Sequence, residues 1–169
     1  EQGYLHVGVW GRTYVYGPSP APEQIISMGA GLFAAPARVN IQLDDEQAEW
    51  DVEPPQVLAA TPEYVVIRHA LRLGRLHLVS RTRIDYDGLA RVDCELSARE
   101  EVTITRLNVV LPIRAEHARY FYHYPGLWGD ATNAGARPAD SFYSDFRPFV
   151  WVGDEQRGLC GFCEHEVNI

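Results

Sequence analysis

The sequence contains no lysine: all fifteen of its basic residues are arginine, against 23 acidic residues, and the formal net charge is −8. A nucleic-acid-binding protein normally carries a basic patch, because neutralising phosphates supplies most of its affinity. The acidic balance therefore predicts no nucleic-acid partner.

Long apolar runs are also lacking. No segment approaches the roughly 20 apolar residues of a membrane span and no signal peptide is visible, so we expect no membrane partner.

Cysteine is scarce, with three residues in the chain. Cys160 and Cys163 have the C-x-x-C spacing of redox and zinc sites. Zinc needs four ligands, and the sequence offers no second pair of that kind. Residues three apart on a strand point to opposite faces, so we interpret these cysteines as small buried residues. Glu164, His165 and Glu166 form an acid–His–acid cluster that we interpret as a solvated strand end, and we expect no metal or other cofactor.

A helical period is absent, and alternation of apolar and polar residues dominates instead. Asp87-Gly88 is a strong signal for a tight hairpin turn, in which both central residues have positive φ. The apolar phase slips between Ile104 and Leu107, which predicts a β-bulge. The central strands are expected over residues 63–73, 75–86, 90–97 and 102–113. Successive antiparallel strands of this kind predict an all-β fold, a two-sheet antiparallel β-sandwich formed as a single domain by residues 1–169.

Ten of the nineteen aromatic residues lie between Tyr120 and Trp151. Tyr120, Tyr122 and Tyr124 share one face of a strand, and one of its two faces must be core. Residues 129–144 then read as a long loop, and loops of this length are often functional. The aromatic rings form either a platform for sugars or a packed core or domain interface. The residues selected as carbohydrate-binding or interface candidates are Trp128, Asp130, Arg137, Phe142, Tyr143 and Glu164.

Asp154 and Glu155 are adjacent carboxylates in a second expected hairpin turn, across residues 154–157. A glycosidase pair needs carboxyl groups about 5–9.5 Å apart across one bond, with one carboxyl at a raised pKa. Neighbouring side chains in a turn point apart and stay solvated. We therefore expect Asp154 to bind the amides of its own turn, Arg157 to pair with Asp154 or Glu155, and no catalytic residue in this hairpin.

Several motifs resemble one family, in order along nearly the whole chain. They are Trp10-Gly11-Arg12-Thr13-Tyr14, Gln24-Ile25-Ile26-Ser27-Met28-Gly29, Leu32-Phe33-Ala34-Ala35-Pro36, Tyr86-Asp87-Gly88-Leu89-Ala90-Arg91-Val92, the run from Phe149 to Leu159, and Phe162 with Glu164. Together they resemble the N-terminal β-sandwich domain of proteins similar to glycoside hydrolase family 123, whose known members are β-N-acetylgalactosaminidases. The resemblance implies that catalysis resides in a separate barrel, so no catalytic residue is carried over. The chain departs from the family at residues 165–167, where it has His-Glu-Val.

Three functions follow as hypotheses. The first is a non-catalytic accessory module whose partners are carbohydrate and a downstream catalytic domain of the same polypeptide. The second is an autonomous carbohydrate-binding module, and the third is a sugar epimerase-like enzyme that would use His77, His123 and Glu95. The chain begins at Glu1 rather than Met and stops just after a strand-like segment, so we expect it to be a fragment of a longer multidomain protein.

Overall fold

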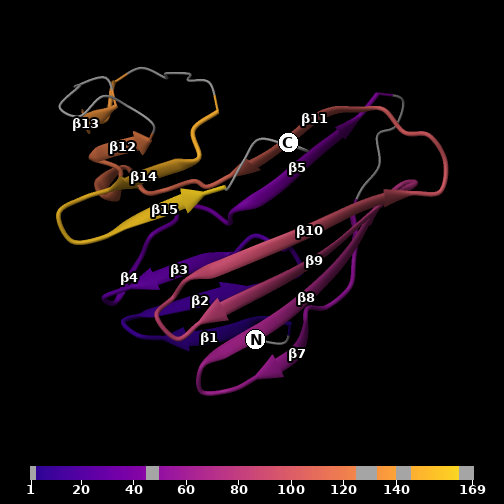
Figure 1. Cartoon of the computed structure of the whole chain (residues 1–169), viewed down its shortest axis with the longest axis horizontal. Helices are drawn as coiled ribbons and strands as arrows, with labels where there is room; N and C mark the ends of the chain where they lie inside the picture. The colour runs from indigo at the N-terminus through magenta and orange to yellow at the C-terminus, as the bar shows by residue number, and fades with distance from the viewer. Residues whose placement is uncertain (1–2, 45–49, 125–132, 140–145, 164–169) are drawn as a thin grey trace. The chain divides into compact units, whose positions relative to one another are not determined.

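The computed structural model describes residues 3–44, 50–124, 133–139 and 146–163, and they form an all-β, antiparallel fold (Figure 1). This confirms the predicted fold class. The chain divides into two compact units, Glu1–Pro112 (unit 1) and Ile113–Ile169 (unit 2). The prediction of a single domain over residues 1–169 stays a prediction. In the described part of the chain, no helix has the length and apolar character needed to cross a membrane.

The described residues of unit 1 form three antiparallel sheets. The first, in the order β1-β2-β3-β4, comprises β1 (Leu5–Val9), β2 (Arg12–Tyr16), β3 (Gln24–Ser27) and β4 (Ala30–Gly31). The second, in the order β10-β9-β8-β6 with β7 also paired to β8, comprises β6 (Trp50–Val52), β7 (Gln56–Ala60), β8 (Tyr64–Leu73), β9 (Leu76–Asp85) and β10 (Ala90–Ala98). The third pairs β5 (Arg38–Leu43) with β11 (Ile104–Val110).

The core of unit 1 lies where these sheets face one another, as in a β-sandwich. Tyr16 of β2 is 1% exposed, and its ring contacts the ring of His69 on β8 with 5.8 Å between centroids. A second cluster joins Leu43 of β5 to Leu73 and Leu76, at the ends of β8 and β9 that meet. Because side chains alternate across a strand, Leu76, Leu78 and Ile84 of β9 point to the core while Arg81 and Arg83 point outward.

Three buried polar side chains interrupt the apolar inner face. His69, Ser80 and Thr82 are fully buried on β8 and β9, and their polar atoms have no hydrogen-bond partner among the described residues. His69 and Ser80 are direct cross-strand partners. Burial lowers the pKa of His69; the nearby Gly17 carbonyl opposes this shift in part but does not complete a hydrogen bond. An unpaired polar group of this kind makes the core sensitive to protonation.

We expect the free energy of unfolding to fall as the pH is lowered from about 7 toward 5. The unfolded chain binds a proton at the ordinary histidine pKa of about 6.5, whereas native His69 resists protonation. Since the unfolded state then binds more protons, stability rises with pH in this window, by at most about 1.4 kcal/mol per pH unit. Urea unfolding at several pH values measures this slope.

The matched control replaces a histidine outside the core. His69→Leu should flatten the pH dependence below 6.5, whereas His6→Gln, at an exposed position, should keep it. Equal slopes for the wild type and His69→Leu would contradict the prediction.

The turns show where the sequence signals were right and where they were wrong. The β9–β10 hairpin forms at the predicted place, but in the turn Tyr86–Gly88 positive φ is confined to Gly88, at +86°. The amide of Gly88 donates to the Asp85 carbonyl at 2.9 Å, so the loop has three residues rather than two. The tight turn with two positive φ values lies instead at Met28 and Gly29, between β3 and β4.

Strand β11 contains the predicted bulge, since its register against β5 shifts between Ile104 and Arg106. Strand β10 differs from the expectation, because its alternation predicts one buried face. Val92 is 47% exposed and Cys94 is exposed. β10 lies at the end of the order β10-β9-β8-β6, and the inner face of the sheet is covered nearer its centre. The alternation of this strand therefore leaves apolar side chains in solvent.

Unit 2 is a smaller four-stranded antiparallel sheet with the order β13-β12-β14-β15. Its elements are a short 3-10 helix η1 (Ala115–His117), β12 (Tyr120–Tyr124), β13 (Ala134–Ala136), β14 (Phe149–Gly153) and β15 (Gly158–Phe162). The β14–β15 hairpin turns across residues 154–157, as predicted, and is closed by the Asp154 amide donating to the Arg157 carbonyl at 2.8 Å.

Candidate functional site

The β14–β15 hairpin contains the run from Phe149 to Leu159, one of the motifs of the family resemblance, and two glycines close it. Gly153 and Gly158 are cross-strand partners. A Cβ on Gly153 would meet the ring of Trp151 and lie 2.6 Å from the Arg157 carbonyl oxygen. A Cβ on Gly158 would lie 2.7 Å from Nε1 of the same indole. Both positions therefore need glycine because the Trp151 ring occupies the space above them.

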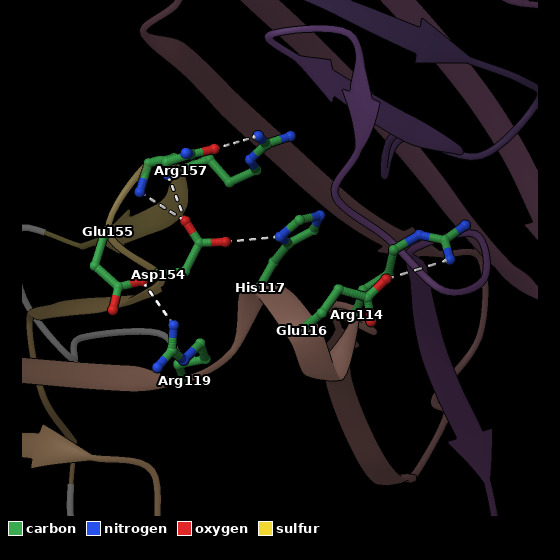
Figure 2. A network of polar contacts seen from close by, with 8 residues as sticks. Arg114, Glu116, His117, Arg119, Asp154, Glu155 and Arg157 are labelled. Carbon is green, nitrogen blue, oxygen red and sulfur yellow. Dashed lines mark hydrogen bonds and ion pairs between the residues drawn. The ribbon is translucent and has the colours of Figure 1, made fainter.

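Asp154, the first residue of the turn, has both carboxylate oxygens engaged (Figure 2). Oδ1 accepts the amides of Gln156 at 2.7 Å and Arg157 at 2.8 Å, and Oδ2 lies 2.7 Å from Nδ1 of His117. The Gln156 amide and the His117 ring lower the pKa of Asp154 to about 2. The carboxylate is thus ionised at neutral and mildly acidic pH, and it ties the turn to the end of η1.

Glu155 lies next to it and takes part in a second contact, at the surface. Its Oε2 accepts from the Arg119 guanidinium at 2.9 Å, and its Oε1 accepts from the Tyr120 hydroxyl at 2.8 Å (Figure 2 shows the Arg119 pair). Its own backbone amide and the Tyr120 hydroxyl lower the pKa of Glu155, and the same contact raises the pKa of Tyr120. A glycosidase general acid needs a raised carboxyl pKa, and here both are lowered. We call the β14–β15 hairpin, with these contacts to His117, Arg119 and Tyr120, the braced hairpin.

The predictions for this turn are confirmed in part. Asp154 binds its own turn amides as expected, but its side chain is only 11% exposed, so the expectation that it stays solvated is wrong. Its carboxylate pairs with His117, and that of Glu155 with Arg119. The ion pair expected for the Arg157 side chain stays a prediction. His117 and Arg119 lie 37 and 36 residues from their partners, so no local spacing could reveal them. The pairing of β12 with β14 brings them together.

The tyrosine-rich strand β12 also gains a definite orientation. Phe121 and His123 are buried, whereas Tyr122 and Tyr124 on the opposite face are 37% and 55% exposed. The ring of Tyr122 packs edge-on against Phe149 with 5.8 Å between centroids. The sequence did not decide which face of this strand belongs to the core. The structure shows that it is the face of Phe121 and His123.

Most residues selected from the sequence as binding or interface candidates lie outside the described residues: Trp128, Asp130, Phe142, Tyr143 and Glu164. Arg137 is described, and its Nε donates to the Ala118 carbonyl at 2.9 Å while its backbone amide donates to the Arg119 carbonyl at 2.8 Å. Arg137 thus holds the main chain beside β12. Whether the selected group contacts a glycan or another domain stays a prediction.

The cysteines are not buried. Cys94, Cys160 and Cys163 are all free and exposed, which corrects the interpretation of small buried residues. β10 lies at the end of its sheet order, and β15 at the end of its own, which explains the exposure of Cys94 and Cys160. Partial burial of the sulfur raises the pKa of both thiols, so neither is an activated thiolate. Among the described residues, no group of three His, Cys, Asp or Glu side chains could hold a metal ion.

The residues named for the epimerase-like alternative lie on different elements: His77 on β9, Glu95 on β10 and His123 on β12. That alternative stays a prediction.

Two other motifs meet in unit 1. The backbone amide of Trp10, the guanidinium of Arg12 and the hydroxyl of Tyr14 donate to three successive carbonyls of the β9–β10 turn. The acceptors are Tyr86 at 3.0 Å, Asp87 at 2.6 Å and Gly88 at 2.7 Å, in that order. We call this set of contacts the turn clamp. It joins the first sheet to the second and fixes the position of the turn.

Two of the motifs that suggested a family from the sequence thus form the turn clamp, and the run from Phe149 to Leu159 forms the braced hairpin. The family described as "Glycoside hydrolase 123, third domain" matches residues 7–165, which cover both. The chain belongs to this family. No curated protein and no solved structure matches the chain.

The family match supports a non-catalytic domain associated with glycoside hydrolases. It does not confirm the N-terminal position that the resemblance implies, since the family is described as a third domain.

Proposed function

We propose that the chain is a non-catalytic β-sandwich module that supports a companion catalytic domain of the same polypeptide and also offers a surface to glycan. The observation that carries this proposal is the match to a domain family of glycoside hydrolase 123 over nearly the whole chain. The lowered carboxyl pKa values of the Asp154 hairpin favour a supporting role over a hydrolytic one.

The β5–β11 sheet offers a surface for the companion domain. Leu107 pairs with Ile41 and Val109 with Val39, so these side chains share the face that carries buried Leu43. Leu107 and Val109 are nevertheless 48% and 61% exposed. An apolar stripe therefore runs from the core into solvent, and exposed apolar patches usually mark interaction surfaces. A companion domain that covers this stripe would extend the core.

A charge in the stripe tests this role in the parent protein. Val109→Asp should lower N-acetylhexosaminide turnover by the full-length parent at least about fivefold, since burying an unpaired carboxylate against the companion domain is costly. Asn108→Asp, one residue away and on the opposite face of β11, is the matched control and should leave turnover unchanged. Release of nitrophenol from nitrophenyl N-acetylhexosaminides measures both variants.

The isolated chain is the second arm of this experiment and should release no nitrophenol. Sustained release that is abolished by Asp154→Asn or Glu155→Gln would overturn the non-catalytic role. Equal activity of the Val109→Asp and Asn108→Asp parents would overturn the supporting role of the stripe.

A further inference from the structure

A groove of about 320 Å³ opens in unit 1 beside the turn clamp. Its volume falls at the lower end of the range for small-molecule sites. It belongs to unit 1, whereas the aromatic stretch selected from the sequence belongs to unit 2. Its lining includes Trp10, Thr61, Glu63, Tyr64 and Tyr86. The lining thus combines aromatic rings with a carboxylate and a hydroxyl.

Two aromatic rings at this groove are unusually exposed. Trp10 is 82% exposed and Tyr86 is 65% exposed, although Tyr86 ends the expected strand 75–86 in phase with buried Ile84. Their backbones are held firmly: the Trp10 amide donates to the Tyr86 carbonyl at 3.0 Å, and the Tyr86 amide donates to the Glu63 carbonyl at 2.9 Å. The main chain that carries both rings is therefore fixed, so a ligand has to order only their side-chain torsions, which lowers the entropic cost of binding.

The opposite side of the groove is a rigid polar loop between β7 and β8. The Thr61 hydroxyl accepts the amides of Glu63 at 3.2 Å and Tyr64 at 3.1 Å, which fixes the loop. The Arg83 guanidinium lies 4.0 Å from the centre of the Tyr64 ring and braces that side chain. The exposed Glu63 carboxylate makes no ion pair with any described residue, so it is available as a hydrogen-bond acceptor.

We propose that this groove binds a neutral saccharide ring, stacked on Trp10, flanked by Tyr86 and hydrogen-bonded through a hydroxyl to Glu63. The C–H face of a pyranose is apolar and packs on an aromatic face, while its hydroxyl rim needs acceptors. A carboxylate in the groove and the net charge of −8 disfavour anionic ligands such as nucleotides. The choice of a sugar over an organic cation rests on the proposed function, because the family is associated with glycoside hydrolases.

The test uses the isolated chain and follows the Trp10 indole N–H by two-dimensional ¹H–¹⁵N NMR. The titrants are N-acetylgalactosamine, galactose and glucose, with tetramethylammonium as the cationic probe. We expect saturable shifts of the Trp10 signal with at least one sugar, at a Kd of about 1 mM, as suits a single ring with few contacts.

For the Trp10 variants, which lack the indole probe, the Tyr86 amide signal reports binding. Trp10→Ala should raise the Kd for sugar at least tenfold, and Glu63→Gln should raise it about threefold. Trp10→Phe, which keeps a ring, should recover part of the affinity lost in Trp10→Ala and covers the case in which the alanine variant fails to fold. Tyr124→Ala removes an aromatic ring that is 55% exposed in unit 2, and it should bind like the wild type.

Three results would overturn the proposal. They are no saturable shift with any of the sugars up to about 50 mM, saturable binding of tetramethylammonium in place of sugar, or equal losses from Trp10→Ala and Tyr124→Ala. The isolated chain contains no companion domain, so the result of the sugar titration is independent of the turnover measured for the Val109→Asp parent. Either proposal can therefore fail while the other stands.

Discussion

Alanine at Gly153 or Gly158 is expected to destabilise unit 2 by about 1–3 kcal/mol, the usual cost of inserting a methyl group into fully occupied space. At Gly153 the new Cβ would lie 2.6 Å from the Arg157 carbonyl oxygen, and at Gly158 it would lie 2.7 Å from the Val152 carbonyl oxygen. Both obstacles are backbone atoms of the hairpin itself, so the strain cannot be relieved by turning a flexible side chain. The Trp151 ring would also have to leave its place over the glycine pair.

The same hairpin supplies a matched control. Gly161 lies on β15, and a Cβ there meets nothing within 4 Å, so Gly161→Ala should change stability by less than about 0.5 kcal/mol. Urea unfolding followed by Trp fluorescence measures all three variants through their midpoints and slopes. If Gly161→Ala costs as much as Gly153→Ala, then general strand propensity, rather than the space above the glycine pair, governs this hairpin.

The sequence could reveal only the local part of this hairpin. Turn residues gave the position of the hairpin and the amide contacts of Asp154, because both depend on neighbours along the chain. His117 and Arg119 were missed, since they reach the hairpin only through the pairing of β12 with β14. The space requirement at the two glycines was missed as well, because it depends on where the Trp151 ring lies across the hairpin.

A similar limit applies to the candidate binding surface. The sequence pointed to the aromatic stretch after Tyr120 because rings are concentrated there. The groove in unit 1 uses few aromatic residues, but it draws Trp10 and Tyr86 from positions far apart in the chain. Sequence composition can detect aromatic residues that are close together in the chain. A platform whose rings come from separate hairpins can be recognised only when the pairing of the strands and the exposure of the side chains are known. The unexpected exposure of Tyr86 is the signal that the strand pattern missed.

The turn clamp also unites two motifs that carried the family resemblance. Trp10-Gly11-Arg12-Thr13-Tyr14 supplies the three donors and Tyr86-Asp87-Gly88 the three acceptors. In this part of the chain, the residues that carry the family resemblance are therefore the ones that form the contact between the first sheet and the second. Trp10 and Tyr86 also line the groove, so the same contact sets the spacing of the two main-chain positions that carry its most exposed rings.

Gly88→Ala should break the turn clamp and destabilise unit 1 by about 1–3 kcal/mol, the cost of holding an L-residue at a disfavoured backbone conformation. Gly88 has φ of +86°, and a Cβ would lie 2.7 Å from the Arg12 guanidinium carbon. Arg12 can swing away, but it then loses its 2.6 Å bond to the Asp87 carbonyl. Tyr14→Phe should cost a similar amount, because the buried bond to the Gly88 carbonyl, 2.7 Å long, is lost without a replacement.

Gly8→Ala is the control for both variants, because a Cβ at Gly8 on β1 meets nothing within 4 Å and should cost less than about 0.5 kcal/mol. Urea midpoints rank the three proteins. The Trp10 indole signal gives a second readout, since loss of the clamp should shift it in Gly88→Ala and in Tyr14→Phe. Two destabilised variants with an unchanged Trp10 signal would mean that the clamp contributes to stability alone, and that the position of the Trp10 ring is fixed by the β1–β2 hairpin without it.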